Sequence, residues 1–312
     1  MTGRDDPVIV AEFDGLFRRC SNWGRWGPDD TKGALNHLGP EQLTAAAALV
    51  GAGVAVPCGR ALATEPAADN PAPTLHYLTR LPSLDNPPGS RVGVASDFIG
   101  LECHGEVQSH LDALCHISLD GLLYNGWPAD SVTMTGASHC GLEVASHGII
   151  SRGVLLDIAA LHDQPWLPGG FTVSGKDLAA AEAAAGVSVR TGDVVLIRTG
   201  QALRREVEGP WDSANLKAGL HPRAMPWLKD RDVAALGFDG DGESEPHGYA
   251  GIAAPIHVLG ITAMGLHFFD ALTLELLAAE CARQGRYEFM FTALPVHATG
   301  ATGCAVNPVA IF

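Results

Sequence analysis

One short segment of the chain concentrates the residue types that bind metal ions or move protons. Every second position between residues 104 and 112 carries a polar side chain, in the order His104, Glu106, Gln108, His110 and Asp112. In an extended strand alternate side chains point to the same face, so these five would form one polar row. A buried row of this kind needs an ion or a bound substrate to compensate its lost hydration.

The pair most able to hold one ion is His110 with Asp112, because residues two apart on a strand point the same way. Glu106 lies on the same face but about 13 Å away along an extended strand, and it could join only through a bend or a tight loop. A helix would align 106 with 110 but not 112. His116 could curl back beside the pair as a proton donor. The alternative is a polar edge strand facing solvent, which the apolar neighbours of the segment disfavour.

The rest of the chain reads as a mixture of strands and helices that must position this segment. Ser174 is expected to cap a helix over 174–185, and a second helix over 273–283 is expected to stop at Gly285. A further apolar stretch, 255–264, is predicted to be helical. Strands are expected over 54–62, 101–112, 148–159, 192–200, 232–239, 266–270 and 287–294. Because strands and helices do not alternate strictly, this order predicts an α/β fold with a mixed sheet. We expect one domain over 1–312, which includes an N-terminal arm and helix in 1–60.

Residues 64–90 hold many Pro, Asn and Asp residues and are predicted to form a long loop. A loop of this length in a compact domain often shapes a binding site.

Composition excludes several classes of protein. The chain has 312 residues, 46% of them apolar and 18% charged, with a formal net charge of −15. This acidic balance argues against nucleic-acid binding and against a basic contact with membranes. Seven scattered cysteines without a C-x-x-C pair suggest reduced thiols, and no stretch has the length of a membrane span. We therefore expect a cytoplasmic protein.

Other catalytic schemes have little support. No Gly-x-Ser-x-Gly motif is present, which counts against a serine hydrolase of the α/β type. Cys115 and His116 are adjacent, so on an extended chain they point apart and do not make a dyad. No Gly-x-Gly-x-x-Gly motif follows a predicted strand, so a nucleotide cofactor is not indicated.

The segment from Ser109 to His116 resembles the (S/T)-H-x-D-x-x-x-H core of the cyclase family of metal-dependent hydrolases, which includes bacterial kynurenine formamidase, isatin hydrolase and a trans-dienelactone hydrolase. The resemblance extends from Asn22-Trp23-Gly24 to Asn307-Pro308. It implies a swivelling β/β/α domain with a mixed central sheet, assembled as a homo-oligomer, either a dimer or a tetramer.

The resemblance also assigns roles to individual residues. His110 and Asp112 match a histidine and an aspartate ligand, and His116 matches the final histidine of the motif beside the metal. Glu106 stands where the family has its first histidine ligand, which adds oxygen to the donor set and favours manganese or another oxygen-tolerant ion over zinc. His104 is a spare imidazole that could substitute if Glu106 turns away.

A second patch resembles the family's late histidine and glutamate. His257 matches the histidine, and Asp270 stands at the position of the glutamate. Without the resemblance, a structural core histidine would be the favoured interpretation of His257. Trp23 and Trp26 are candidates for capping a substrate pocket, and packing of the N-terminal arm explains them equally well. The acidic run 239–243 reads more readily as a solvated turn than as part of a site.

The resemblance implies hydrolysis of an amide, formamide, cyclic imide or lactone in a small molecule, by a metal-activated water with His116 as proton donor. One alternative is a metal-dependent cyclase or lyase that closes a ring or removes water. Another is a non-catalytic binding protein on the same scaffold, suggested by Glu106 at the position of the first histidine.

Overall fold

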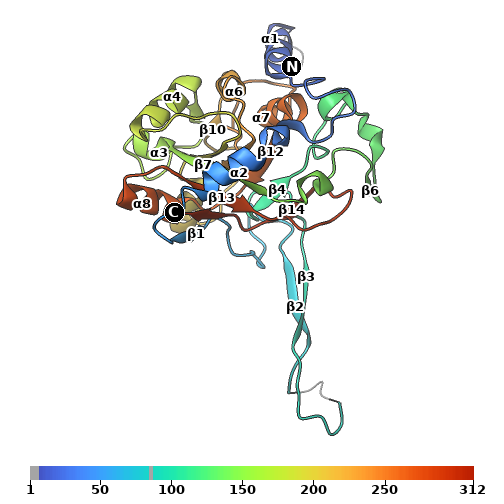
Figure 1. The fold of residues 1–312 in the computed structure, drawn as a ribbon. Helices are drawn as coiled ribbons and strands as arrows, with labels where there is room; N and C mark the ends of the chain where they lie inside the picture. Colours follow the sequence, from blue (N-terminus) through green and yellow to red (C-terminus); the bar gives the residue numbers. More distant parts are fainter. Residues whose placement is uncertain (1–6, 84–86) are drawn as a thin grey trace.

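A computed structural model of the chain describes residues 7–83 and 87–312. Its centre is a nine-stranded sheet in the order β1-β15-β13-β7-β9-β11-β12-β4-β14 (Figure 1). These strands are β1 Ala55–Pro57, β4 His110–Asp112, β7 Ile149–Asp157, β9 Val194–Arg198, β11 Ala235–Phe238, β12 His267–Asp270, β13 Glu288–Ala293, β14 Gly303–Ala305 and β15 Val309–Ile311.

The sheet combines a parallel centre with antiparallel flanks. Strands β7, β9, β11 and β12 run parallel, whereas β4 and β14 on one flank and β13, β15 and β1 on the other pair antiparallel. The parallel strands are largely buried, and every residue of β9 is buried, as expected for a strand covered on both sides. The predicted α/β fold with a mixed sheet is confirmed.

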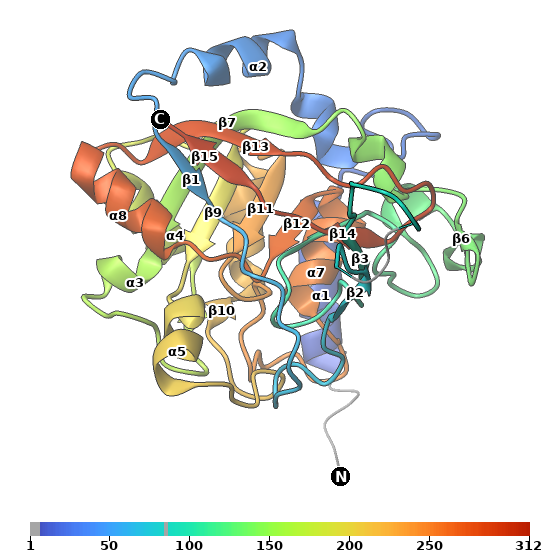
Figure 2. The same ribbon diagram turned by 90° about the horizontal axis from the view of Figure 1, so that it is seen from below.

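Helices cover the sheet and connect its strands. In Figure 2, α2 lies on one side of β7 and β13, and α3 and α4 lie on the opposite side of the strands in this view. The α-helices are α1 Pro7–Cys20, α2 Pro40–Ala47, α3 Ile158–Leu161, α4 Gly175–Ala184, α5 Gln201–Glu208, α6 Met225–Lys229, α7 Pro255–His257 and α8 Glu275–Gln284. A π-helix, Val258–Met264, continues α7, and 3-10 turns span Gly33–His37, Tyr124–Gly126, Ala129–Ser131, Leu142–Ala145 and Pro222–Ala224.

Local signals in the sequence explain several helix ends. Ser174 caps α4 by accepting a hydrogen bond from the backbone of Asp177, whose carboxylate accepts one from the backbone of Ser174 in return. Gly285 ends α8 in the left-handed conformation that glycine adopts without strain. Both predictions are confirmed.

A two-stranded ribbon projects from the body of the molecule (Figure 1). Its strands, β2 Leu75–Arg80 and β3 Ser96–Gly100, pair antiparallel and form a sheet of their own. The prediction of a continuous loop over 64–90 is therefore wrong for residues 75–80. Two further two-stranded sheets pair β5 Val132–Thr133 with β6 Gly136–Ala137, and β8 Thr172–Val173 with β10 Gly219–Leu220.

The strand expected over 101–112 is much shorter, since only His110–Asp112 form β4. Upstream of it, side chains rather than a backbone ladder hold the segment in place. Gln108 donates to and accepts from the backbone of Ala63, at 3.0 and 3.1 Å. Ser109 accepts from Arg60 N at 2.8 Å and donates to Ala271 O at 2.6 Å. The polar row predicted for one continuous strand is consequently broken before residue 110.

All seven cysteines are free thiols, and six of them are buried. Among the described helices, none has both the length and the apolar character that crossing a bilayer demands.

Candidate metal centre

Two neighbouring antiparallel strands, β4 and β12, bring one imidazole and two carboxylate side chains together in the buried interior. His110 and Asp112 project from the same face of β4, and Asp270 of β12 is directly opposite His110 in the register. His257, in α7, completes the group. All four side chains are buried, and Asp112 is wholly inaccessible to solvent.

The donor atoms of these four residues converge. His110 Nε2 lies 3.4 Å from Asp112 Oδ1 and 4.0 Å from Asp270 Oδ2. His257 Nε2 lies 3.1 Å from Asp270 Oδ2 and 3.6 Å from Asp112 Oδ2. Ligand atoms around a divalent ion, each about 2.0–2.2 Å from it, have spacings of this size. Two groups of three result, His104 with His110 and Asp112, and Asp112 with His257 and Asp270.

The residues present fit a divalent cation. Asp112 Oδ2 and Asp270 Oδ1 are buried and have no hydrogen-bond partner among the described residues. A buried carboxylate oxygen without a partner is costly, and a cation would satisfy it. Each histidine has its second nitrogen engaged, since His110 Nδ1 is 2.7 Å from Gln108 O and His257 Nδ1 is 3.0 Å from Glu243. These bonds orient Nε2 of both rings toward the carboxylates, as in metal sites.

Glu243 is a site residue that sequence reasoning missed. The sequence favours a solvated turn for the acidic run 239–243, yet Glu243 is only 3% exposed. Its Oε1 accepts hydrogen bonds from both the backbone nitrogen and Nδ1 of His257, at 2.9 and 3.0 Å. No local sequence motif predicts the contact of Glu243 with His257, because it depends on where α7 begins relative to the loop after β11.

His104 comes from the turn before β4 and lies against the same carboxylate. Its Nδ1 is 2.8 Å from Asp112 Oδ1, and its Nε2 is 2.9 Å from the hydroxyl of Thr302. The ring of His116 stacks on that of His104 with centroids 3.8 Å apart and planes 8° from parallel. The structure thus brings His104 and His116 to the edge of the group formed by His110, Asp112, His257 and Asp270.

Burial and neighbouring charges shift the pKa values of these groups in opposite directions. Burial would lower the pKa of His104, but the hydrogen bond to Asp112, with that of Cys103 and the charges of both, raises it to about 10. Burial would raise the pKa of Asp112, but the hydrogen bond from His104 and the nearby ring of His257 hold it well below its usual value. Burial lowers the pKa of His116 to about 4, so this imidazole is neutral at pH 7.

The structure does not bring Glu106 to His110 and Asp112. Its carboxylate is 2.8 Å from Lys217 Nζ, which is also 2.5 Å from Asp241 Oδ2. Burial, followed by the charge of Asp241, raises the pKa of Glu106 despite the lysine. Lys217 is itself nearly inaccessible, and its two carboxylate neighbours raise its pKa against the effect of burial.

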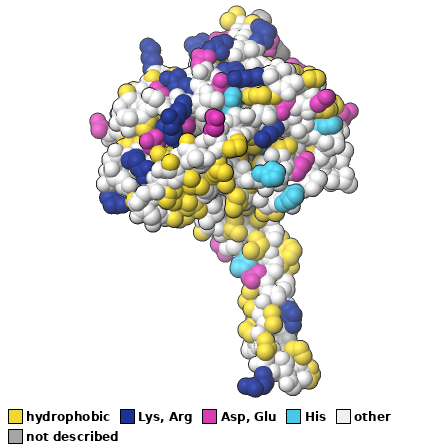
Figure 3. All heavy atoms as spheres, in the orientation of Figure 1, with side chains coloured by type: hydrophobic (Ala, Val, Ile, Leu, Met, Phe, Trp, Pro, Cys, Tyr) yellow, Lys and Arg dark blue, Asp and Glu magenta, His cyan; other side chains and the backbone are white. Residues whose placement is uncertain are grey.

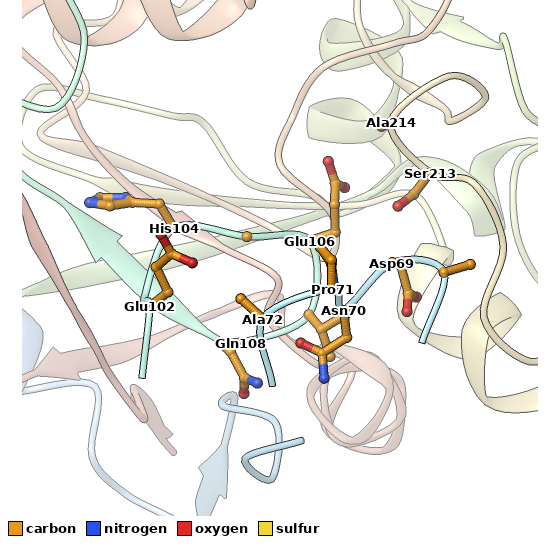
Figure 4. A pocket seen from close by; sticks show the side chains of 13 residues that line it. Asp69, Asn70, Pro71, Ala72, Glu102, His104, Glu106, Gln108, Ser213 and Ala214 are labelled. Carbon is orange, nitrogen blue, oxygen red and sulfur yellow. The ribbon is translucent and has the colours of Figure 1, made fainter. Parts of the chain in front are cut away.

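A cavity of about 220 Å³ opens beside the centre. In Figure 4 three segments meet around it: one carries Asp69, Asn70, Pro71 and Ala72, another His104 and Glu106, and a third Ser213 and Ala214. Its described lining includes the carboxylates of Asp69, Glu102 and Glu106 and no lysine or arginine. Asp69 is paired with Arg205 at 2.6 Å, and Glu106 with Lys217.

The two tryptophans suggested for a pocket cap do not line this cavity. Trp23 donates from Nε1 to Thr262 O at 2.7 Å and packs edge-on against Phe17. Trp26 contacts the ring of His37 and the guanidinium of Arg25. Both attach the segment after α1 to the body.

Comparison with known proteins connects this geometry to a family. A family model described as "Putative cyclase" matches residues 79–242, more than half of the chain. The chain belongs to the cyclase family. A crystal structure described as a novel cyclase is 30% identical to this cyclase-family chain, covers 94% of it and 99% of its own length, and has a TM-score of 0.84.

Structures of two hydrolases share the fold of this cyclase-family chain at lower identity. Isatin hydrolase A from Ralstonia solanacearum is 19% identical, with 82% of this chain and 91% of the other covered and a TM-score of 0.56. A predicted metal-dependent hydrolase from Bacillus stearothermophilus is 15% identical, with coverages of 83% and 98% and a TM-score of 0.53. No curated protein matches the chain.

Proposed function

We propose that this protein is a metal-dependent hydrolase that cleaves an amide, formamide, cyclic imide or lactone bond in a small molecule. One observation carries the proposal: buried imidazole nitrogens and carboxylate oxygens converge beside a cavity, and two of those oxygens have no other partner. The similarity to an isatin hydrolase and to a predicted metal-dependent hydrolase supports the reaction class.

In this proposal His110, Asp112, His257 and Asp270 hold the metal, and His104 takes the place expected of Glu106. A bound divalent ion would supply an acidified water and polarise the scissile carbonyl. The donor set of three imidazoles and two carboxylates suits either manganese or zinc. Glu106 instead neutralises Lys217 at the side of the cavity.

His116 is the proposed proton carrier. Its ring stacks on His104 at the edge of the centre, and its low pKa leaves a ring nitrogen free to accept a proton at pH 7. The protonated ring would then give that proton to the leaving nitrogen or oxygen of the substrate. Asp112, hydrogen-bonded to His104, fixes the plane of the ring against which His116 stacks.

The charge of the cavity indicates which substrates fit. Glu102 is exposed at its lining, and the two other carboxylates there already have cationic partners. The unpaired charge of the described lining is therefore that of Glu102, which would repel a carboxylate, so we infer neutral or cationic substrates. Apolar contacts from Pro71, Ala72 and Val107 would hold its hydrocarbon part.

The test uses the purified protein, stripped with a chelator and reloaded with manganese or zinc. Each form is incubated with a panel of lactones, cyclic imides, amides and N-formyl arylamines, and the masses of the products are measured by mass spectrometry. We expect turnover only in a reloaded form, with product masses that add up to the substrate mass plus one water: one heavier product from a lactone or cyclic imide, and two fragments from an amide or N-formyl arylamine. Full turnover by metal-free protein would refute the proposal.

The description of the family as a cyclase supports one alternative, a cyclase or lyase reaction at the same centre. Dehydration, or ring closure with loss of water, would give a single product lighter than its substrate by one water, which the same spectra distinguish. Metal and ligand binding without any change in mass would indicate a non-catalytic binding protein.

A further inference from the structure

A second, smaller cavity adjoins the one beside the candidate metal centre, and we call it the side pocket. Its volume is about 20 Å³, which is enough for one water molecule or one small polar group. Asp69, Glu106 and Ser213 line both cavities, so the two share a wall. The larger cavity lies where the body joins the ribbon of β2 and β3, which stands clear of the body in Figure 3. In Figure 4, Asp69 and Ser213 lie on the side of that cavity away from His104.

Two buried side chains of the side pocket have atoms that could form hydrogen bonds but lack a partner. Gln201, the first residue of α5, is 3% exposed, and Ser213, in the loop after α5, is 5% exposed. Gln201 Oε1 and Ser213 Oγ have no hydrogen-bond partner among the described residues. The amide of Gln201 is oriented by its Nε2, which donates to Leu167 O at 3.1 Å, so Oε1 is a free acceptor. Buried polar atoms of this kind are costly unless a ligand or a water bonds to them.

The charges around the side pocket balance. Its lining includes three cationic and three acidic side chains: Arg60, Arg205, Lys217, Asp69, Glu106 and Asp239. Arg205 is 2.6 Å from Asp69, and Lys217 is 2.8 Å from Glu106. The carboxylate of Asp239 accepts hydrogen bonds from Thr199 and Gly200, and Arg60 donates to the backbone oxygen of Asp239. A lining of zero formal charge whose ions already have partners favours a neutral polar group over an anion or a cation.

We propose that the side pocket binds a hydroxyl group at the end of the substrate remote from the scissile bond. The proposal rests on the proposed hydrolase function, because it names a group of that enzyme's substrate. A hydroxyl suits both free atoms, since it can donate to Gln201 Oε1 and accept from Ser213 Oγ. It is also close in size to the single water that the pocket could hold. No residue of the described lining belongs to the two groups of metal donors, so a group bound there lies away from the reacting atoms.

Gly240 leaves open the space that this hydroxyl would occupy. It lines the side pocket, and a Cβ atom at this position would lie 3.9 Å from Cγ of Gln201, in ordinary van der Waals contact. Gly240 is outside the left-handed region of backbone conformation, so alanine can replace it without backbone strain. The added methyl group would fill much of so small a pocket. Gly240→Ala should therefore close the side pocket and leave the fold intact.

The first experiment compares probes that differ in one terminal group. The probes are δ-lactones and N-formyl anilines that carry an alkyl chain of graded length, ending either in a hydroxyl or in a methyl group. For wild-type protein reloaded with manganese or zinc, we expect kcat/KM to be about tenfold higher for the hydroxyl member of at least one pair. Gly240→Ala and Ser213→Ala should each remove most of this preference.

Ser131→Ala is the matched control for Ser213→Ala. Ser131 Oγ is also buried without a partner among the described residues, but Ser131 lines neither cavity. Its substitution should leave the preference for the hydroxyl member unchanged. Neither serine variant should lower the melting temperature, because neither hydroxyl gives up a hydrogen bond within the described chain. A fall in melting temperature for Ser213→Ala alone would indicate a structural role for Ser213 and would contradict the proposal.

Binding without turnover separates this proposal from the hydrolase function. Saturation-transfer NMR on chelator-treated protein measures the affinity for each probe, and we expect the same preference for the hydroxyl member, lost in Gly240→Ala. That preference without turnover of any probe would refute the hydrolysis and support the side pocket as a ligand site. No preference in any pair, or a preference that Gly240→Ala and Ser213→Ala leave unchanged, would overturn the proposal and indicate a pocket that holds only an ordered water.

Discussion

His110 and Asp270 face each other across β4 and β12, with Nε2 4.0 Å from Oδ2. The pairing comes from backbone register, because His110 and Asp270 are cross-strand partners in an antiparallel ladder. Asp112, two residues along β4, adds its carboxylate to the same face. The centre is thus built mainly on regular strands, with His257 and His104 added from a helix start and a turn.

Asp112→Asn should remove metal and activity together. The amide keeps the shape of the side chain but lacks the charge that both groups of donors share. We expect metal content, measured by elemental analysis, to fall below one-tenth of the wild-type value, and kcat/KM to fall by about 10³ or more. Asp241→Asn is the control, since Asp241 lies beside Lys217 and outside the donor groups. Full metal content in Asp112→Asn would contradict the proposed centre.

Substituting His104 and Glu106 in turn should show which of the two is the metal ligand. His104→Ala should weaken metal binding at least tenfold, because it removes an imidazole in contact with Asp112. Glu106→Gln should retain metal and lower the free energy of unfolding by about 1–3 kcal/mol, because it weakens the partnership with buried Lys217. Titration with metal and denaturant unfolding measure the two effects. If Glu106→Gln loses metal as completely as Asp112→Asn, Glu106 is a ligand after all.

Metal binding should release protons at neutral pH. In the metal-free protein His104 has a pKa of about 10 and that of His257 is also raised, so both rings carry protons at pH 7. A ligating imidazole must be neutral, so the ion displaces at least one proton. Apparent affinity should therefore increase about tenfold per pH unit for each proton displaced, between pH 6 and 8. Calorimetry in buffers of different ionisation enthalpy counts these protons, and a count of zero would show that neither raised pKa governs binding.

Glu243→Ala should weaken metal binding by about 10- to 100-fold, although Glu243 touches the centre only through His257. The variant frees the ring of His257 to rotate and leaves its Nδ1 without an acceptor. Because this is a positioning effect, excess metal should restore kcat largely, whereas it should not rescue Asp112→Asn. Unchanged affinity in Glu243→Ala would remove Glu243 from the site.

Reversing the charge at the cavity should alter substrate preference. Glu102→Lys replaces the exposed carboxylate of the lining with an ammonium group. For a pair of substrates that differ only in a remote carboxylate, we expect the variant to improve kcat/KM for the anionic member several-fold. The neutral member should change little. The gain should diminish in 0.5 M salt, since charges at this exposed position are screened.

Part of the arrangement at the candidate centre could be predicted from local geometry. A spacing of two residues on a strand was enough to predict that His110 and Asp112 point the same way, and both residues lie in β4. The choice between Glu106 and His104 could not be made in this way, because Lys217 lies 111 residues from Glu106 in the chain. The alternation of faces expected along a strand does not hold upstream of residue 110, where side-chain hydrogen bonds of Gln108 and Ser109 replace the backbone ladder.

The apolar strands and the capped helices were predictable for a similar reason, since their signals are contained in short windows. Ser174 and Gly285 mark helix ends wherever those helices pack. Strand β2 was missed because its side chains do not alternate between buried and exposed, and prolines follow it closely. Order within the sheet depends on contacts that no short window contains.

The ladder between β4 and β12 has a consequence for folding. Formation of these main-chain bonds brings the side chains of Asp112 and Asp270 into the same dry interior whether or not a cation is present. Two acids confined together repel, and the protons on neighbouring rings relieve that repulsion only at a cost in hydration. The protein should consequently melt at a lower temperature after treatment with a chelator, while its backbone remains superimposable on that of the loaded form.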